Sequence, residues 1–306
     1  MARSTGAGLP RWLAKSPRMS HAELEPGYTR ESSGLFVRNG LSEPPGGFDA
    51  RTIRVLANMQ ERHFWYRGRT KLLLDVVSRL LDTHFKGRSV EVIDFGAGAG
   101  GFIRSLTREL PGRFSTLAIA DASRAAIEEV HTLGLLPDGV TRFQVDLLDL
   151  GFDSRWDLVF ALDVLEHVPD DDSAFCQIAA ALRPGGLFVM TAPALNSLWT
   201  SNDQMAGHFR RYARKDLARR ASTAHLELLD ARYFMFILAP ALWLSRKLAR
   251  APKSDVEIRA HLERTHRVPP APLNSALAWL FELETPLGRR LEFPWGTSVL
   301  GVFRKP

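Results

Sequence analysis

Short apolar runs alternate with stretches of helical periodicity along most of the chain. Runs rich in β-branched and aromatic residues predict seven strands, at 90–95, 114–121, 140–145, 156–162, 186–192, 226–233 and 298–304. Apolar side chains at helical spacing predict helices at 69–84, 101–110, 123–133, 172–182 and 215–223. This alternation predicts an α/β fold, a doubly wound, Rossmann-like sheet with helices on both faces.

The same pattern divides the chain into five segments. Residues 1–50 show no sustained periodicity, and we expect them to form a mostly disordered N-terminal tail. We expect a helical lid at 51–88, a Rossmann-like core at 89–233, a helical, partly apolar insertion at 234–296 and the closing strand of the core at 297–306. No run reaches the roughly 18 apolar residues of a membrane-spanning helix, and the N-terminus lacks the apolar run of a secretory leader.

The composition narrows the class of protein. With 45% hydrophobic and 24% charged residues among 306, the chain is typical of a globular protein, which excludes a collagen-like or wholly disordered chain. The single cysteine, Cys176, cannot form an internal disulfide, so we expect a reducing, cytoplasmic environment. Cys176 falls in a predicted helix, and we expect it to be buried there as a small apolar residue.

The formal net charge of +6 is spread unevenly. Residues 1–90 carry 15 basic and 8 acidic side chains, residues 91–200 carry 7 and 16, and residues 201–306 carry 18 and 10. Two basic segments therefore flank an acidic middle. The arginines of the flanks are scattered and no nucleic-acid-binding motif accompanies them, so we do not expect a nucleic acid partner.

The loop between the first predicted strand and the next helix is rich in glycine, with the sequence DFGAGAGG at 94–101. Glycines let the backbone turn tightly and approach a ligand, and the helix that follows offers free N–H groups. The loop fits the G-x-G-x-x-G pattern of dinucleotide-binding proteins, and it also fits D-x-G-x-G-x-G, starting at Asp94. The glycines alone therefore leave a NAD-dependent oxidoreductase open.

Further motifs follow in order along the core. Asp121 ends the second predicted strand, and Asp146 follows the third. The fourth strand runs into LDVLEHV at 162–168, and LRPGG at 182–186 precedes the fifth. Together with the glycine loop, these motifs resemble those of class I S-adenosylmethionine-dependent methyltransferases. The resemblance favours S-adenosyl-L-methionine over NAD as the cofactor, because the dehydrogenase pattern requires no acid at the position of Asp94.

The resemblance also implies where the cofactor binds. Its methionine end is expected at Asp94 and the glycine loop, its ribose at Asp121, and its adenine amino group at Asp146. The full set of expected cofactor contacts is Asp94, Gly96, Ala97, Gly98, Gly100, Asp121, Ala122, Asp146, Leu147, Leu162 and Asp163. In the family's fold, the last of seven strands is antiparallel and lies between the fifth and sixth. The helical insertion then falls between the sixth and seventh strands.

Three outer motifs resemble a bacterial subgroup of the family: HFWYR at 63–67, GHFRRY at 207–212 and PWGTS at 294–298. Members of this subgroup are often found beside enzymes of polysaccharide and glycolipid biosynthesis. Trp65 and Tyr66 are candidates for binding the acceptor or covering the cofactor, because aromatic faces suit a cationic methyl donor. Packing of the same aromatic rings in the core is the alternative.

Two histidines are candidates for the base that a hydroxyl acceptor requires. His167 follows the fourth strand, at the sheet edge where α/β proteins bind ligands, although it could instead cap the next helix or bond a backbone carbonyl. His208 follows the fifth strand at the same edge. Arg211 and Tyr212 beside it are candidates for binding the acceptor, and an ordinary surface charge is the alternative for the arginine.

One candidate metal site consists of Asp163, Glu166 and His167, which lie at i, i+3 and i+4. They are similar to the acid-x-x-Glu-His pattern that binds a divalent metal in quinone-biosynthesis O-methyltransferases and small-RNA 2′-O-methyltransferases. Here the first acid is Asp rather than Glu, and spacing supplies no fourth ligand. We therefore expect no metal.

The insertion begins with the longest apolar run of the chain, twelve residues at 233–244. Four cations follow it closely: Arg246, Lys247, Arg250 and Lys253. A short apolar segment beside cations suits the surface of an anionic membrane. A buried helix that packs on Leu277, Leu280 and Phe281 is the alternative.

The sequence therefore predicts an S-adenosylmethionine-dependent methyltransferase that acts on an oxygen atom of a small or lipid-linked metabolite. We also expect the protein to contact the inner face of an anionic membrane peripherally. The sequence predicts no oligomeric state. Two other classes stay open. One is a NAD-dependent oxidoreductase, and the other is a non-catalytic, membrane-associated binding protein with a methyltransferase fold.

Overall fold

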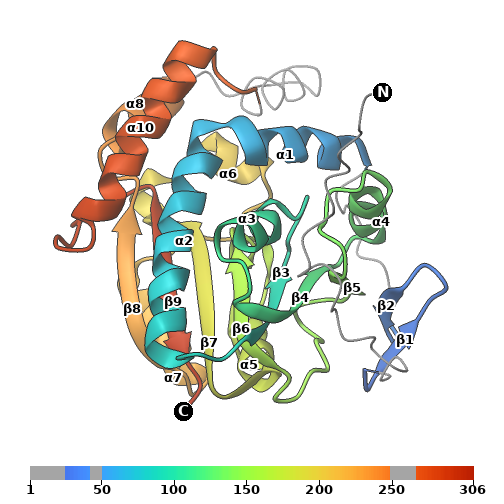
Figure 1. Ribbon diagram of the computed structural model, residues 1–306. Helices are drawn as coiled ribbons and strands as arrows, with labels where there is room; N and C mark the ends of the chain where they lie inside the picture. Colours follow the sequence, from blue (N-terminus) through green and yellow to red (C-terminus); the bar gives the residue numbers. More distant parts are fainter. Residues whose placement is uncertain (1–24, 42–49, 249–266) are drawn as a thin grey trace, which may run out of the picture.

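A computed structural model describes residues 25–41, 50–248 and 267–306 of the chain. A mixed sheet of nine strands forms its centre (Figure 1). The strands are β1 (Tyr28–Arg30), β2 (Leu35–Arg38), β3 (Val90–Phe95), β4 (Phe114–Asp121), β5 (Thr141–Gln144), β6 (Trp156–Leu162), β7 (Leu182–Pro193), β8 (Glu227–Phe234) and β9 (Ser298–Arg304).

The strand order is β1-β2-β5-β4-β3-β6-β7-β9-β8. The strands from β2 to β7 in this order are parallel, whereas β9 is antiparallel to both of its neighbours, β7 and β8. This arrangement confirms the doubly wound α/β fold and the antiparallel last strand between the fifth and sixth strands of the core. The predicted count of seven strands is wrong, because the sheet has two more at one edge.

The two additional strands come from the segment that we expected to be mostly disordered. β1 and β2 form an antiparallel hairpin, and β2 extends the sheet by pairing in parallel with β5. Tyr28 and Phe36 pack against Phe143 of β5, with ring centroids 5.3 and 5.1 Å apart. The expectation is therefore wrong for residues 25–41, and the rest of the segment 1–49 lies outside the described residues.

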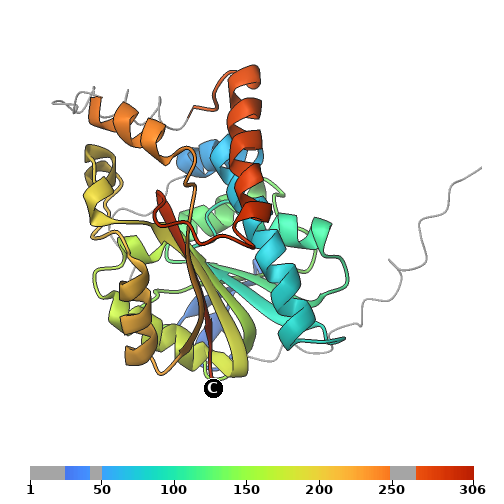
Figure 2. The ribbon, with the colours of Figure 1, turned by 90° about the vertical axis from the view of Figure 1, so that its left-hand side faces the viewer.

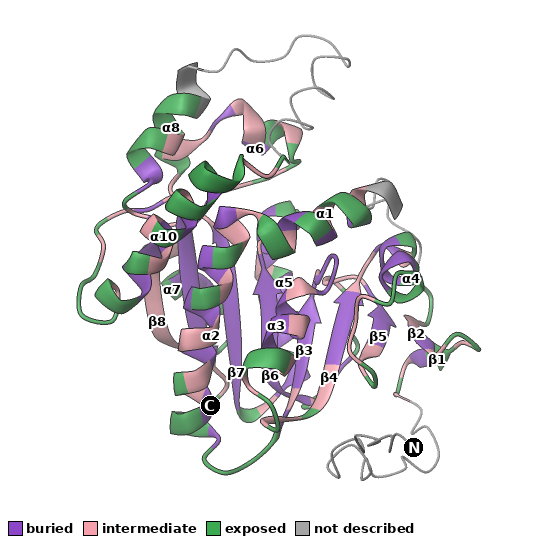
Figure 3. Cartoon of the chain, turned by 45° about the horizontal axis from the view of Figure 1, so that its top comes forward, coloured by how far each residue is buried: buried purple, intermediate pink, exposed green. Residues whose placement is uncertain are grey.

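Helices cover both faces of the sheet. They are α1 (Ala50–Arg62), α2 (Phe64–His84), α3 (Gly101–Glu109), α4 (Arg124–Thr132), α5 (Asp171–Ala181), α6 (Ser201–Met205), α7 (Arg214–Thr223), α8 (Ala239–Leu248) and α10 (Ala271–Leu287), with short 3-10 turns η2 (Leu165–His167) and η3 (Asn196–Leu198). α5 and α7 pack on one face, and α1, α2, α3, α4 and α10 contribute to the core on the other. Figure 3 shows the central strands buried between these two layers.

The insertion does not form one continuous apolar helix. β8 ends at Phe234 and α8 begins at Ala239, so the run at 233–244 is divided between a strand, a loop and a helix. Arg250 and Lys253 lie outside the described residues. α8 and α10 stand at the same end of the molecule, close to α1 and α6 (Figures 1 and 2).

α10 is anchored along α2. A Cβ atom on Gly68 would lie 2.2 Å from the ring of Phe281, so only glycine lets the two helices approach this closely. The side chain of Asn274 accepts a hydrogen bond from the Phe64 amide (2.8 Å) and donates one to the Arg62 carbonyl (2.7 Å). The alternative weighed for the run at 233–244 is present in part, because the ring of Phe234 stacks on that of Phe281 with centroids 6.1 Å apart. Leu277 and Leu280 contribute to the same core.

The single cysteine is exposed where the sequence analysis expected burial. Cys176 lies in α5 as predicted, but its side chain is exposed, so the expectation of burial is wrong. The helical period places Phe175 and Ile178 toward the sheet and Cys176 toward solvent. Among the described residues, no helix is both long and apolar enough to cross a membrane.

Candidate active site

The glycine loop connects β3 to α3 at the carboxyl end of the parallel strands. Gly96, Gly98 and Gly100 have φ angles of 68°, 55° and 71°, in the left-handed region that favours glycine. A Cβ atom on Gly96 would also lie 2.4 Å from a methyl group of Val164, so a larger residue would disturb the segment after β6. The glycines therefore let the loop pack closely against neighbouring segments, at the sheet edge where α/β proteins bind ligands.

Helix α1 covers this loop, which the sequence did not predict. The side-chain oxygen of Gln60 accepts a hydrogen bond from the Gly101 amide at 2.8 Å, and a Cβ atom on Gly98 would lie 2.7 Å from Leu56. The expected lid at 51–88 thus reaches the loop through residues of α1. No sequence motif marks Leu56 or Gln60, because their role depends on how α1 packs.

Asp94 is the most unusual group at this edge. It lies at the end of β3 with 2% of its surface exposed, and its Oδ1 atom has no hydrogen-bond partner among the described residues. Burial raises the pKa of Asp94 to about 7; Arg69 lowers it and Asp121 raises it further. A buried carboxylate with an unpaired oxygen is costly unless a cationic or hydrogen-bonding group joins it. The ammonium group of a methionine-type ligand would meet that requirement.

The other two predicted aspartates also follow strands at this edge. Asp121 ends β4, and its Oδ1 atom accepts a hydrogen bond from the Ser123 amide at 2.9 Å. Burial raises its pKa, and hydrogen bonds from the backbone of Ser123, Gly98 and Ala122 oppose that rise. Asp146 lies two residues after β5, beside Leu147, and accepts a hydrogen bond from the Leu148 amide at 2.9 Å. The fold therefore brings the three aspartates to one edge, at the ends of three adjacent strands.

Asp163 takes part in a different arrangement. It follows Leu162 with a positive φ of 60° and forms an ion pair with Arg69, while the Thr191 hydroxyl donates a hydrogen bond to it at 3.1 Å. The Arg69 guanidinium lies over the rings of Trp65 (4.8 Å) and Tyr66 (5.1 Å). Burial raises the pKa of Tyr66 to about 12. These contacts place both aromatic residues beside the carboxyl end of the parallel strands, where the cofactor is expected and which we call the cofactor edge.

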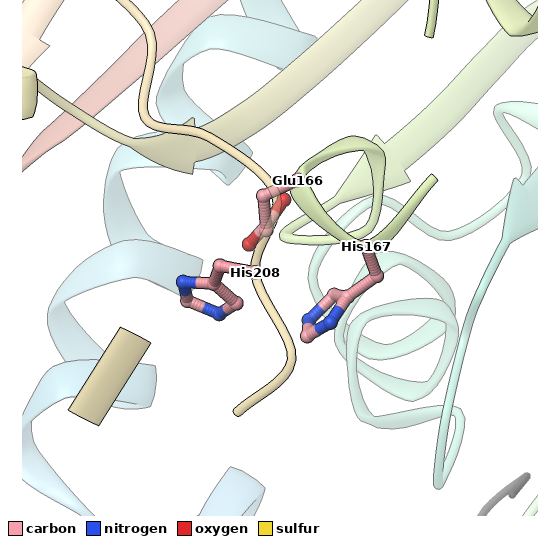
Figure 4. Close-up of side chains that lie close together, drawn as sticks. All are labelled: Glu166, His167 and His208. Atoms are coloured by element: carbon pink, nitrogen blue, oxygen red, sulfur yellow. The ribbon is translucent and has the colours of Figure 1, made fainter. Parts of the chain in front are cut away.

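The two candidate histidines lie together with Glu166, as Figure 4 shows. The ring centroids of His167 and His208 are 4.7 Å apart, with the ring planes at 80°. Desolvation by the surrounding protein and the nearby His208 lower the pKa of His167 to about 4, although His167 is an exposed residue. His167 also hydrogen-bonds the backbone of Ala206, which is the structural role weighed for it from the sequence.

Glu166 is fully enclosed beside these rings. It is 1% exposed, and its Oε2 atom has no hydrogen-bond partner among the described residues. Burial raises the pKa of Glu166 well above its usual range, and the nearby Asp163 raises it further. One ligand atom from each of Glu166, His167 and His208 lies within 4.8 Å of the others, so this group could hold a metal ion. Asp163 does not belong to it, so this group differs from the trio of Asp163, Glu166 and His167 considered from the sequence.

His208 is oriented by a buried carboxylate that the sequence analysis missed. Asp203, in α6, is 1% exposed, and its Oδ1 atom lies 3.0 Å from Nδ1 of His208. The Arg211 guanidinium donates to both oxygens of the same carboxylate, at 2.8 and 3.0 Å. Burial alone would raise the pKa of Asp203, but the hydrogen bonds from His208 and Arg211 hold it below its usual range.

Arg211 and Tyr212 do not face an acceptor. Arg211 is buried between Asp203 and the Ala194 carbonyl, which it contacts at 3.1 Å. Tyr212 is 1% exposed, and its hydroxyl donates a hydrogen bond to Asp171 at 2.7 Å. Both side chains stabilise the segment that carries His208, which corrects the expectation that they bind the acceptor.

Comparison with known proteins agrees with the fold. A family model described as a methyltransferase domain matches residues 64–231, more than half of the chain. The chain belongs to this family, the class I S-adenosylmethionine-dependent methyltransferases. The predicted fold, family and cofactor class are thereby confirmed.

Curated relatives match over part of their length. Phosphoethanolamine N-methyltransferase 2 of Caenorhabditis elegans is 30% identical over 103 residues, which cover 33% of this chain and 23% of that protein. The ubiquinone biosynthesis O-methyltransferase of Nitrobacter winogradskyi is 26% identical over 140 residues, covering 44% and 51%. The chain thus matches about a quarter to a half of the length of these two relatives.

Solved structures share the fold at low identity. Phosphoethanolamine N-methyltransferase 2 of Haemonchus contortus, in complex with S-adenosyl-L-methionine, aligns with a TM-score of 0.52 and 17% identity, covering 86% of this chain and 58% of that one. The complex between the Haloferax volcanii Trm112 methyltransferase activator and a methyltransferase gives a TM-score of 0.52 and 17% identity, covering 84% and 96%. At this identity the likeness concerns the fold alone.

Proposed function

We propose that this protein transfers a methyl group from S-adenosyl-L-methionine to an oxygen atom of a small or lipid-linked metabolite. The observation that carries the proposal is Asp94, a buried carboxylate with an unpaired oxygen at the start of the glycine loop. Such a group costs stability in the unliganded protein, and a cationic ligand compensates for that cost. An adenine dinucleotide brings no ammonium group to this position, so Asp94 favours a ligand with a methionine end over NAD.

The chain's own residues would bind and orient the cofactor. Asp94 and the glycine loop would hold the methionine end, Asp121 the ribose, and Asp146 with Leu147 the adenine. When bound, S-adenosyl-L-methionine supplies an electrophilic methyl carbon. The protein would then contribute alignment of the acceptor and exclusion of water, and Trp65 and Tyr66 lie where they can contribute to both.

We propose His208 rather than His167 as the base. The Asp203 carboxylate beside Nδ1 favours the tautomer with its proton on Nδ1, which leaves Nε2 free to accept a proton from a hydroxyl group. Desolvation and the nearby His208 lower the pKa of His167 to about 4, which makes it the weaker base. In this proposal Asp203 is a positioning residue, because it acts through His208.

The alternative use of this group is a metal ion, and we retain the prediction that none is required. Methyl transfer should survive dialysis against EDTA. A loss of activity that magnesium restores would contradict this prediction and favour metal bound at Glu166, His167 and His208.

The acceptor can be identified directly. The full chain is incubated with methyl-labelled S-adenosyl-L-methionine and a fractionated cell extract, and the labelled product is characterised after extraction into organic solvent and water. Label on an ether or ester oxygen supports the proposal, and label in the organic phase supports a lipid tail. Binding of the cofactor without any turnover would favour a non-catalytic binding protein, and label on nitrogen would contradict O-methylation.

We further propose that the protein acts in the cytoplasm, with peripheral contact at the inner face of the membrane. The lone cysteine supports the first part, because a reducing compartment suits an exposed free thiol. The insertion supports the second part. We propose no oligomeric state.

A further inference from the structure

Exposed large apolar side chains are concentrated in the sequence of the insertion. Of the eleven that the described residues contain, eight fall between 237 and 291. These eight are Ile237, Trp243, Leu244, Leu273, Trp279, Leu283, Leu287 and Leu291. The concentration is unusual because single exposed apolar residues are normal in a soluble protein, whereas a group of them marks an interaction surface.

On α10 these residues form a stripe. Trp279, Leu283 and Leu287 follow at intervals of four, so they lie on one side of the helix. Trp279 is 60% exposed, which is the largest exposed fraction among the large apolar side chains described. The opposite side of α10 carries Ala278 and Phe281, which are buried against α2. The helix is therefore apolar on both sides, and the described part of the chain covers only one of them.

The acids of α10 face the protein instead of the stripe. Glu282 forms an ion pair with Lys71 of α2 at 2.9 Å. Glu284 is 2% exposed and accepts hydrogen bonds from the amides of Phe236 and Ile237, at 2.9 and 2.7 Å. The sequence of α8 contains no acid at all. The exposed stripe is therefore free of carboxylates.

Cations flank the two helices. Arg267 precedes α10 by four residues, Arg290 follows it by three, and both side chains are exposed. The α8 sequence itself contains Arg246 and Lys247. An apolar stripe flanked by cations matches an anionic lipid surface, since apolar side chains enter the interface while cations meet the headgroups. A second copy of the chain would fit less well, because a symmetric pairing of this face would bring the same cations together.

We propose that α8 and the exposed stripe of α10 form a docking surface for an anionic membrane. α10 packs along α2, whose Trp65, Tyr66 and Arg69 lie beside Asp163 at the cofactor edge. Docking would bring this edge close to the lipid surface, where an acceptor with a lipid tail could reach it without leaving the membrane. Docking deepens the proposed membrane contact, and the access of a lipid-tailed acceptor rests on the proposed methyl transfer.

The test is sedimentation of the full chain with vesicles. Phosphatidylcholine vesicles that contain phosphatidylglycerol should bind the protein, vesicles of phosphatidylcholine alone should bind it less, and added salt should weaken binding to the anionic vesicles. The double variant Trp279→Ser/Leu283→Ser should weaken binding at least about tenfold. Leu133→Ser is the matched control, because Leu133 and Leu283 are both 37% exposed and Leu133 lies outside the insertion.

Two outcomes would overturn the proposal. One is no binding of the wild-type chain to anionic vesicles, and the other is unchanged binding of the double variant at an unchanged melting temperature. A wild-type dimer that the double variant converts to a monomer in lipid-free buffer would instead assign this face to a second copy. The same preparations are titrated with S-adenosylhomocysteine. No binding of S-adenosylhomocysteine would contradict the proposed function, whereas the vesicle result would still test the docking surface.

Discussion

At the scale of single residues, the cofactor edge is dominated by one buried acid. Among the described residues Asp94 has no hydrogen-bond partner for Oδ1, and burial raises its pKa to about 7, with Arg69 opposing the rise and Asp121 adding to it. Between about pH 4 and pH 7, Asp94 therefore stays protonated in the unliganded native protein, whereas the unfolded chain has released this proton. The raised pKa of Asp94 stabilises the native protein, and this stabilisation is fully present below about pH 4 and is lost as the pH rises through about 7.

The affinity for S-adenosylhomocysteine should depend on pH in the opposite direction. The ammonium group of that ligand prefers the ionised carboxylate, so affinity should strengthen as the pH rises from about 6 to 8. Isothermal titration calorimetry at several pH values measures this dependence. Asp94→Asn should bind more weakly, by about tenfold or more, and without the pH dependence. Asp138→Asn, at an exposed position, is the control, and an equally pH-dependent Asp94→Asn variant would refute the role of Asp94.

The proposed base gives a second prediction at this scale. His208→Ala should lower the turnover of the labelled acceptor by about 10²–10⁴-fold, because general base catalysis contributes an effect of that size. Its affinity for S-adenosylhomocysteine should stay close to that of the wild type, since His208 is not among the expected cofactor contacts. His131→Ala, at an exposed histidine of α4, should leave both quantities unchanged. Full turnover of His208→Ala would move the role of base to another residue.

At the scale of elements, the sequence predicts what local periodicity determines. All seven predicted strands and five predicted helices are present, with boundaries close to those expected. β1 and β2 were missed because three and four residues are too few to show a period, and their order depends on pairing with β5. α10 was placed only loosely, because its position depends on the contact between Gly68 and Phe281.

That contact can be tested by substitution. Gly68→Ala should lower the free energy of unfolding by about 1–3 kcal/mol, since its new methyl group would overlap the Phe281 ring. Urea unfolding followed by circular dichroism measures the loss. Adding Phe281→Leu to Gly68→Ala should cost less than the sum of the two single changes, because the smaller side chain relieves the overlap. Additive losses would show that the two positions do not meet.

The site was predictable to the extent that strand ends determine it. Asp94, Asp121 and Asp146 could be placed at one edge because each follows a parallel strand, and the structure brings them there. The contact between His167 and His208 joins residues 41 positions apart, which no spacing rule connects. Asp203 lies five residues before His208, and a buried pairing of this kind is visible only after folding.

At the scale of the whole molecule, the uneven charge distribution has a structural explanation in part. Several cations of the first basic segment form ion pairs with acids of the middle segment. Examples are Arg38 with Asp149 (2.8 Å), Arg54 with Glu129 (2.6 Å), Arg88 with Asp157 (3.0 Å), and Arg69 with Asp163. The N-terminal excess of positive charge therefore helps to attach β2, α1 and α2 to the core. The exposed side chains of Arg267 and Arg290 beside α10 fit the proposed membrane surface.

The central claim is that the carboxyl edge of this sheet binds S-adenosylmethionine for methyl transfer. Its most direct test is a pair of calorimetric titrations of the full chain, one with S-adenosylhomocysteine and one with NAD. The account predicts saturable binding of S-adenosylhomocysteine at micromolar concentration and no saturable heat with NAD. No binding of S-adenosylhomocysteine at high micromolar concentration, or tighter binding of NAD, would contradict it.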